Sequence, residues 1–136
     1  VNYIESFSDV ALAAEAATSH IANGADVLTG TAQMVVGATG VALEEGVAWF
    51  GTQSNQTALG EDIVVASQVY HWEVILDDIV AAMEAGAAGS VMIATLANGG
   101  LEIEFNDAYG LDGDVKAAAE ATAAAIADGS IATGVG

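Results

Sequence analysis

The chain has 136 residues, among which are 19 acidic residues, a single lysine and no arginine, and its formal net charge is −18. This balance excludes nucleic acid and anionic membrane surfaces as partners, because binding phosphate requires clustered Lys or Arg. Since 54% of the residues are apolar, the composition also excludes a disordered chain, and the length allows one domain with a real core.

The acidic excess itself is typical of a solvated surface adapted to high salt, since net charge bears on solubility more than on any site. We therefore expect a halophilic source rather than a cation-binding function. The absence of cysteine excludes disulfides, a thiol nucleophile and a zinc–thiolate cluster. Val1 opens the sequence without a targeting signal, and no apolar run is long enough to span a bilayer, so any anchor is expected outside this sequence.

Strands and helices are expected to alternate along the chain, as in an α/β domain with a mainly parallel sheet. The first half predicts, in order, a strand at Val1–Ile4, a helix capped by Asp9 and closed by Asn23-Gly24, a strand at Val27–Thr29, a helix over 33–45 closed by Gly46, and strands at Val47–Phe50 and Ile63–Ser67. Residues 24–56 thus form a complete β-α-β unit. Because parallel strands place their carboxyl ends at a ligand-binding crevice, 30–33 and 53–56 are the first segments to examine for function.

The second half opens with the most amphipathic helix of the chain. Its apolar stripe comprises Trp72, Ile75, Leu76, Ile79, Val80 and Met83, opposite a face of acidic residues. A strand-like run follows at Ser90–Leu96, then a turn at 97–100 that suggests a hairpin or a sharp crossing, and a half-exposed strand at Leu101–Phe105. Asp112 or Asp114 caps a last, alanine-rich helix that ends at Gly129, before a glycine-rich tail.

These segments, taken in order, resemble the BMP-type (basic membrane protein, PnrA-like) substrate-binding proteins of ABC transporters. The matching segments are Glu5-Ser6-Phe7-Ser8-Asp9, Gly24-Ala25-Asp26-Val27, Gly46-Val47 through Gly51-Thr52-Gln53-Ser54-Asn55-Gln56, Ala66-Ser67-Gln68-Val69, Leu96-Ala97-Asn98-Gly99-Gly100-Leu101 and Asn106-Asp107. No single segment is specific, and their colinear series over nearly all of the chain carries the resemblance.

The resemblance implies a Rossmann-like three-layer lobe of a class I periplasmic binding protein, with residues 1–136 forming one α/β lobe, the carboxyl-terminal half of a two-lobed protein. The amino-terminal lobe, with the lipid-anchored cysteine, would be missing. Residues 72–96 would be a crossover segment that contacts the absent lobe. In this chain its apolar stripe would instead fold back on the sheet or drive formation of a homodimer.

The candidate ligand-binding residues are Gly30, Thr31, Gln33, Gln53, Asn55, Tyr70 and Trp72. Gly30 to Gln33 match a glycine-rich turn of relatives at which backbone N–H groups face the ligand, although a plain strand–helix turn has the same composition. Gln53 stands where nucleoside-binding relatives have the aspartate of a V-D-S-D-Q motif that binds ribose hydroxyls. An amide can donate and accept but lacks the charge that strengthens such a contact.

Tyr70 stands where nucleoside-binding relatives have a lysine, and Tyr70-His71-Trp72 is aromatic instead. The two rings could stack on a planar heterocycle. Trp72 also fits the helix stripe, which favours a place in the core. Together the two departures favour a purine-like base or another small polar aromatic solute over a nucleoside.

The resulting expectation is solute capture outside the cell for an ABC importer by hinge closure, with the ABC permease as partner of the full protein and no cofactor, metal or catalytic residue. The expected location is the periplasm or the outer face of the membrane. Neither a nucleophile elbow nor an H-E-x-x-H motif occurs, and Asp107 with Asp112-Gly113-Asp114 lacks EF-hand spacing. The alternative is a freestanding or engineered half-protein that dimerises and has a structural role. A small flavodoxin-like enzyme or phosphoacceptor domain is a weaker third possibility.

Overall fold

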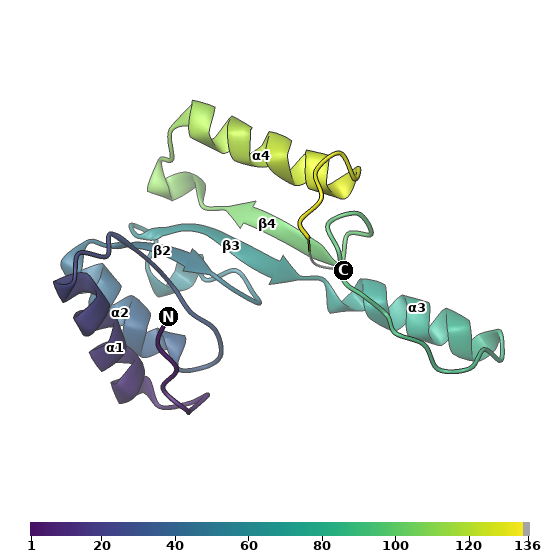
Figure 1. Ribbon diagram of the computed structural model, residues 1–136, viewed down its shortest axis with the longest axis horizontal. Coiled ribbons are helices and arrows are strands. Elements are labelled where there is room, and N and C mark those ends of the chain that lie inside the picture. Colours follow the sequence, from purple (N-terminus) through teal and green to yellow (C-terminus); the bar gives the residue numbers. More distant parts are fainter. Residues whose placement is uncertain (135–136) are drawn as a thin grey trace. The chain divides into compact units, whose positions relative to one another are not determined.

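The computed structural model describes residues 1–134, and it contains four helices, four strands and two short 3-10 turns within that range. In chain order (Figure 1) they are α1 (Val10–Ala22), β1 (Val27–Thr29), α2 (Val35–Glu45), β2 (Ala48–Gly51), a turn at Thr57–Leu59, β3 (Val64–Tyr70), α3 (Trp72–Glu84), β4 (Leu101–Phe105), a turn at Asp107–Tyr109 and α4 (Gly113–Ala127).

The strands form one open sheet in the order β1-β2-β3-β4. The pairs β1–β2 and β2–β3 are parallel, with Leu28 opposite Trp49 and Trp49 opposite Val64, and an irregularity after Trp49 shifts the register of β3 by one residue. β4 runs against β3, because the Asn106 N–H donates to the Val65 carbonyl and the His71 N–H donates to the Gly100 carbonyl. The predicted α/β class with a mainly parallel sheet is confirmed.

The chain divides into two compact units. The first unit holds Val1–Gln68 and Glu104–Leu111, and the second holds Val69–Ile103 and the chain from Asp112 onward. Both β3 and β4 therefore pass from one unit to the other.

The hydrophobic core lies in the first unit. Its buried members are Val35, Ala42, Val47, Trp49, Ile63 and Val64, with Ile21, Leu28, Ala38 and Leu59 packed against them. α1 packs along α2 in the same unit (Figure 1). The core thus fixes β1, β2 and the amino-terminal part of β3. The carboxyl ends of these strands carry the candidate site.

Local signals in the sequence explain where these helices begin and end. The Asp9 carboxylate accepts a hydrogen bond from the Leu12 N–H at 3.0 Å and starts α1, as predicted. Gly46 adopts the left-handed conformation, φ 67°, that ends α2. Asp112, rather than Asp114, caps α4, because its carboxylate accepts from the N–H groups of residues 114 and 115.

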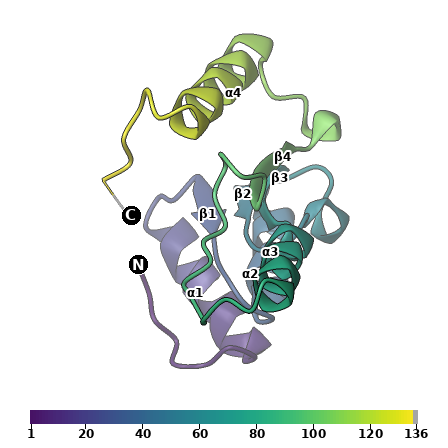
Figure 2. The same ribbon diagram turned by 90° about the vertical axis from the view of Figure 1, so that its right-hand side faces the viewer.

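Two predicted strands are wrong. Val1–Ile4 is irregular and largely exposed, and Ser90–Leu96 also has no regular structure (Figure 2). A strand is stabilised by hydrogen bonds to a neighbour, and the described part of the chain offers neither segment a partner strand. The turn at 97–100 is consequently not a hairpin between two strands.

In the second unit few side chains are buried. α4 has no buried residue, and Ile75 is the single buried side chain of α3. Most of the predicted apolar stripe of α3 is exposed, with exposed fractions of 59% for Leu76, 52% for Val80 and 73% for Met83. No helix within residues 1–134 combines the length and the apolar character that a membrane crossing requires.

Candidate functional site

The candidate site is the carboxyl edge of the parallel strands in the first unit. Three segments meet there, namely residues 30–33 after β1, residues 51–56 at and after β2, and residues 67–68 of β3. This is the edge at which open α/β sheets bind ligands. Of the predicted site residues, Gly30, Thr31, Gln33, Gln53 and Asn55 belong to this unit, and Tyr70 and Trp72 belong to the second.

The turn after β1 leaves little room for a side chain at position 30. A Cβ there would lie 3.2 Å from Cη2 of Trp49 and 3.3 Å from Cγ1 of Val35. The buried Trp49 ring therefore lies directly beneath this turn. Thr31 and Gln33 are exposed beside it, where their side chains can reach a solute.

Two residues at this edge hold a backbone conformation that only glycine adopts easily. Ala32 has φ 69° and Gln53 has φ 73°, and each such residue costs of order 1 kcal/mol. Left-handed non-glycine residues persist where the surrounding structure holds them, and they cluster at ligand-binding positions.

Side-chain hydrogen bonds join the two segments. The Thr52 hydroxyl donates to the Gly30 carbonyl at 2.6 Å, and the Ala32 N–H donates to Oε1 of Gln53 over a longer distance of 3.4 Å. The Gln53 side chain thus lies over the turn after β1 while its amide N–H₂ remains a possible donor to a ligand. The two left-handed residues therefore lie side by side at the ends of neighbouring strands.

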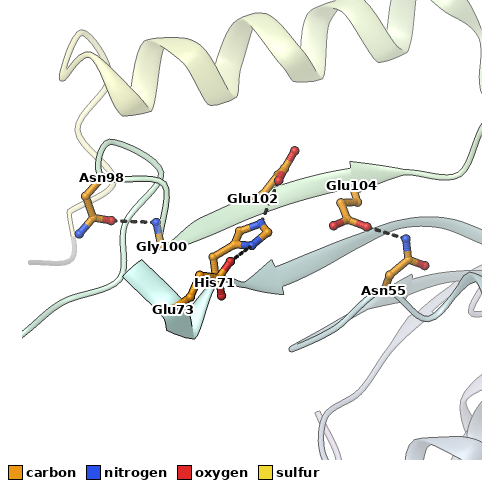
Figure 3. A network of polar contacts seen from close by, with 7 residues as sticks. All are labelled: Asn55, His71, Glu73, Asn98, Gly100, Glu102 and Glu104. Atoms are coloured by element: carbon orange, nitrogen blue, oxygen red, sulfur yellow. Dashed lines mark hydrogen bonds and ion pairs between the residues drawn. The ribbon is translucent and has the colours of Figure 1, made fainter. Parts of the chain in front are cut away.

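The side chain of Asn55 is held by hydrogen bonds within the same unit. Its Nδ2 donates to Oε2 of Glu104 on β4 at 2.6 Å (Figure 3). Its Oδ1 accepts from the Thr57 N–H at 2.9 Å. Both polar ends of the side chain are occupied, which suits a role in holding the loop. Glu104 was not predicted as part of the site, because its partner lies 49 residues away in the sequence.

Gln56 lies in the predicted segment 53–56 but was not named as a site residue, and its side chain is buried at the end of the loop. A glutamine in a polar loop carries no signal of burial, so only the structure identifies this feature. On the neighbouring strand, Nε2 of Gln68 is buried without a hydrogen-bond partner.

Tyr70 and Trp72 form a stacked pair in the second unit. Their ring centroids are 4.9 Å apart and the planes are inclined by 27°. Trp72 remains 59% exposed, so the core position that its place in the helix stripe favours is wrong. One face of the indole is covered by tyrosine, and an exposed aromatic surface is left for stacking.

His71 lies between these aromatic residues in the sequence and contacts two carboxylates of the second unit. Its Nδ1 lies 3.0 Å from Oε1 of Glu73, and its Nε2 lies 2.9 Å from Oε2 of Glu102 (Figure 3). Both contacts are hydrogen bonds only when both ring nitrogens carry protons. The bonds to Glu102 and then Glu73 raise the pKa of His71 above 6.5. The pKa of Glu73 is lowered, chiefly by its own backbone N–H and then by His71.

The first unit contains neither lysine nor arginine. The sequence has one lysine, Lys116 in α4, and no arginine. The groups at the candidate site are hydroxyls, amides and backbone N–H groups. Such groups recognise a neutral polar solute, whereas an anionic solute would meet no balancing charge from this unit.

The family comparison matches residues 1–132 to the PnrA-like ABC transporter substrate-binding proteins, termed Bmp. Because the match covers nearly the whole chain, the chain belongs to this family, and the resemblance seen in the sequence is confirmed. No curated protein matches the chain.

Two solved structures are similar in fold. One is titled a transcriptional activator of the comK gene from Bacillus halodurans, with 16% identity and a TM-score of 0.80 over 92% of this chain. The other is an ABC transporter solute-binding protein from Conexibacter woesei, with 21% identity and a TM-score of 0.72 over 96% of this chain. The matches cover 44% of each of those chains, so the chain spans less than half of their length. The fold is that of periplasmic binding proteins.

Proposed function

We propose that this member of the PnrA-like family forms one part of an extracytoplasmic protein that captures a small, neutral, polar solute for an ABC importer. The observation that carries the proposal is the pair of left-handed residues, Ala32 and Gln53, joined across the carboxyl ends of β1 and β2. The proposal involves binding alone and no catalytic step.

A purine or a related heterocycle is the ligand class that these residues suit best. Gln53 offers an amide that donates and accepts, and Thr31 and Gln33 add exposed polar groups. The Tyr70–Trp72 pair offers an aromatic surface for stacking on a planar base.

The full protein is proposed to contain a further lobe and to deliver its solute to a membrane permease, because the chain spans only 44% of two related structures. The exposed stripe of α3 and the exposed apolar side chains of the irregular segment 90–96 suit contact with that lobe, because neither is covered within the described chain.

Isothermal titration of the complete protein with adenine, adenosine and inosine in molar salt tests the proposal. Gln53→Ala should weaken binding of the active compound by roughly tenfold or more, as expected for loss of a hydrogen bond to a ligand. Ser54→Ala, at an exposed neighbouring position of the same loop, is the matched control and should bind normally. Equal affinities of the Gln53→Ala variant and the wild type would contradict the proposed site.

A second candidate function, a self-associating half-protein with a structural role, is favoured by the same exposed stripe of α3. A second copy could cover Trp72, Leu76 and Met83. Sedimentation of the chain in molar salt distinguishes the two. A stable dimer that Leu76→Glu converts to a monomer supports this function, and a monomer that binds a separately produced first lobe supports solute capture.

A further inference from the structure

We infer that Gln56 is a positioning residue that holds the loop carrying Gln53 in its binding conformation. Its side chain is buried, with 8% of the residue exposed, so it cannot be a principal ligand contact. Its hydrogen bonds instead connect the loop to the core and to two neighbouring strands. For ligand binding the inference rests on the proposed function, but the loop conformation can be measured without any ligand.

Three hydrogen bonds define this role. Oε1 of Gln56 accepts from the Trp49 indole N–H at 2.7 Å, and its Nε2 donates to the Thr52 carbonyl at 2.8 Å. Its backbone N–H donates to the Ser67 hydroxyl on β3 at 3.0 Å. The side chain amide thus closes the loop from residue 52 to residue 56 around Gln53.

The same indole links this loop to the turn after β1. Trp49 is 1% exposed and its ring approaches Gly30 so closely that a Cβ there would be 3.2 Å away. Gln56 fixes one edge of the ring by its hydrogen bond, and Gly30 packs against another. Both segments of the candidate site therefore rest on one buried ring, whose orientation depends on Gln56.

The close packing around Gly51 restricts the loop further. A Cβ at Gly51 would lie 2.5 Å from Oγ of Ser67 and 3.0 Å from Cβ of Gln56. Little space remains for the start of the loop to move while Gln56 stays in place. The left-handed φ of Gln53, 73°, is unfavourable by itself and persists because both ends of the loop are held.

Gln56→Met tests the inference because methionine has a similar length and volume but makes none of the amide hydrogen bonds. The amide proton of residue 56 should exchange roughly tenfold to a hundredfold faster relative to the amide of Val64, given the usual loss for a buried hydrogen bond. The backbone carbon chemical shifts of Gln53 should also move from left-handed toward extended values. The control Ile63→Val perturbs the core of the same unit and should change neither the exchange ratio nor the Gln53 shifts.

Two outcomes overturn the inference, namely unchanged Gln53 shifts in Gln56→Met, or a rise in exchange at residue 56 no larger than the rise at Val64. Should Gln56→Met fail to fold, Gln56→Glu keeps an acceptor for the Trp49 indole N–H but loses the donor to the Thr52 carbonyl, and the same two readouts apply. In a Trp72→Phe background, Trp49 fluorescence reports directly on the indole that Gln56 holds.

Titration of the complete protein with adenine, adenosine and inosine then tests whether the loop conformation matters for binding. Weaker binding of the active compound by Gln56→Met than by Ile63→Val supports positioning for the ligand. If wild-type protein binds none of the tested purines, the proposed function fails while the exchange result on Gln56 stands.

Discussion

At Gly37 of α2, helix α1 approaches helix α2 closely, and a substitution there has a calculable effect. A Cβ at Gly37 would overlap the carbonyl oxygen of Val10 and lie 2.9 Å from Cγ1 of the same residue. The overlapping atom belongs to the backbone of α1, so no side-chain rotation relieves it. Gly37→Ala therefore requires the two helices to move apart.

The size of the effect follows from two opposing terms. Alanine is favoured over glycine inside a helix by about 0.5–1 kcal/mol, whereas overpacking costs about 1–3 kcal/mol or more. Because the overlapped atom is backbone, the overpacking cost should be about 3 kcal/mol, and after the helix gain is subtracted we expect Gly37→Ala to lower the free energy of unfolding by about 2 kcal/mol. Gly40 in the same helix is the matched control, because nothing lies within 4 Å of its Cβ position, and Gly40→Ala should raise the free energy by about 0.5–1 kcal/mol.

Urea unfolding in molar salt, followed by Trp49 fluorescence in a Trp72→Phe background, measures both variants. Trp49 lies in the same buried cluster as Val35 of α2, so it reports on the unit that contains the helix contact. If Gly37→Ala proves as stable as Gly40→Ala, the close approach of α1 to α2 is wrong.

Three further predictions concern charge and capping. Because the net charge is −18, thermal stability should rise steeply between 0.1 M and 1 M NaCl, where the screening length falls from about 10 Å to about 3 Å. A Tm that does not change with salt would contradict self-repulsion as the dominant electrostatic effect. NMR titration should find the pKa of His71 above 6.5 and closer to 6.5 in Glu102→Gln. Because folding raises this pKa, the stabilising contribution is complete below pH 6.5 and is lost as the pH rises through the folded value, and an unchanged His71 pKa in Glu102→Gln would refute the contact. Asp112→Ala should destabilise α4 by about 1 kcal/mol, measured as loss of helical circular dichroism on heating, whereas Asp114→Ala should have a smaller effect.

Local patterns in the sequence were sufficient for most of the elements. The Asp9 cap, the left-handed Gly46 and the apolar run at Val27–Thr29 appear as predicted. Each depends on interactions within a few residues of the chain, which a sequence displays directly. The predicted strands at Val1–Ile4 and Ser90–Leu96 did not form, because a strand depends on a neighbour that local sequence cannot supply.

The candidate site shows the same division. The β-α-β pattern and the position of the loops were enough to predict residues 30–33 and 53–56 as the edge of interest, since ligand binding at carboxyl ends is typical of a parallel sheet. The sequence could not indicate that Gln56 is buried, that Asn55 is committed to Glu104, or that His71 contacts two carboxylates. These contacts join residues from separate strands, and their distances depend on how the chain packs.

By itself, then, the sequence determined the α/β class, the family resemblance and the side of the sheet on which to look for a ligand. Composition, capping residues and apolar periodicity are local or additive properties, so they can be read without coordinates. Only the tertiary structure decided that Ala32 and Gln53 lie together in strained conformations, and that Gly30 and Gln56 both contact the ring of Trp49. That arrangement arises from hydrogen bonds and close packing between segments about 20 residues apart in the chain, which no local pattern encodes.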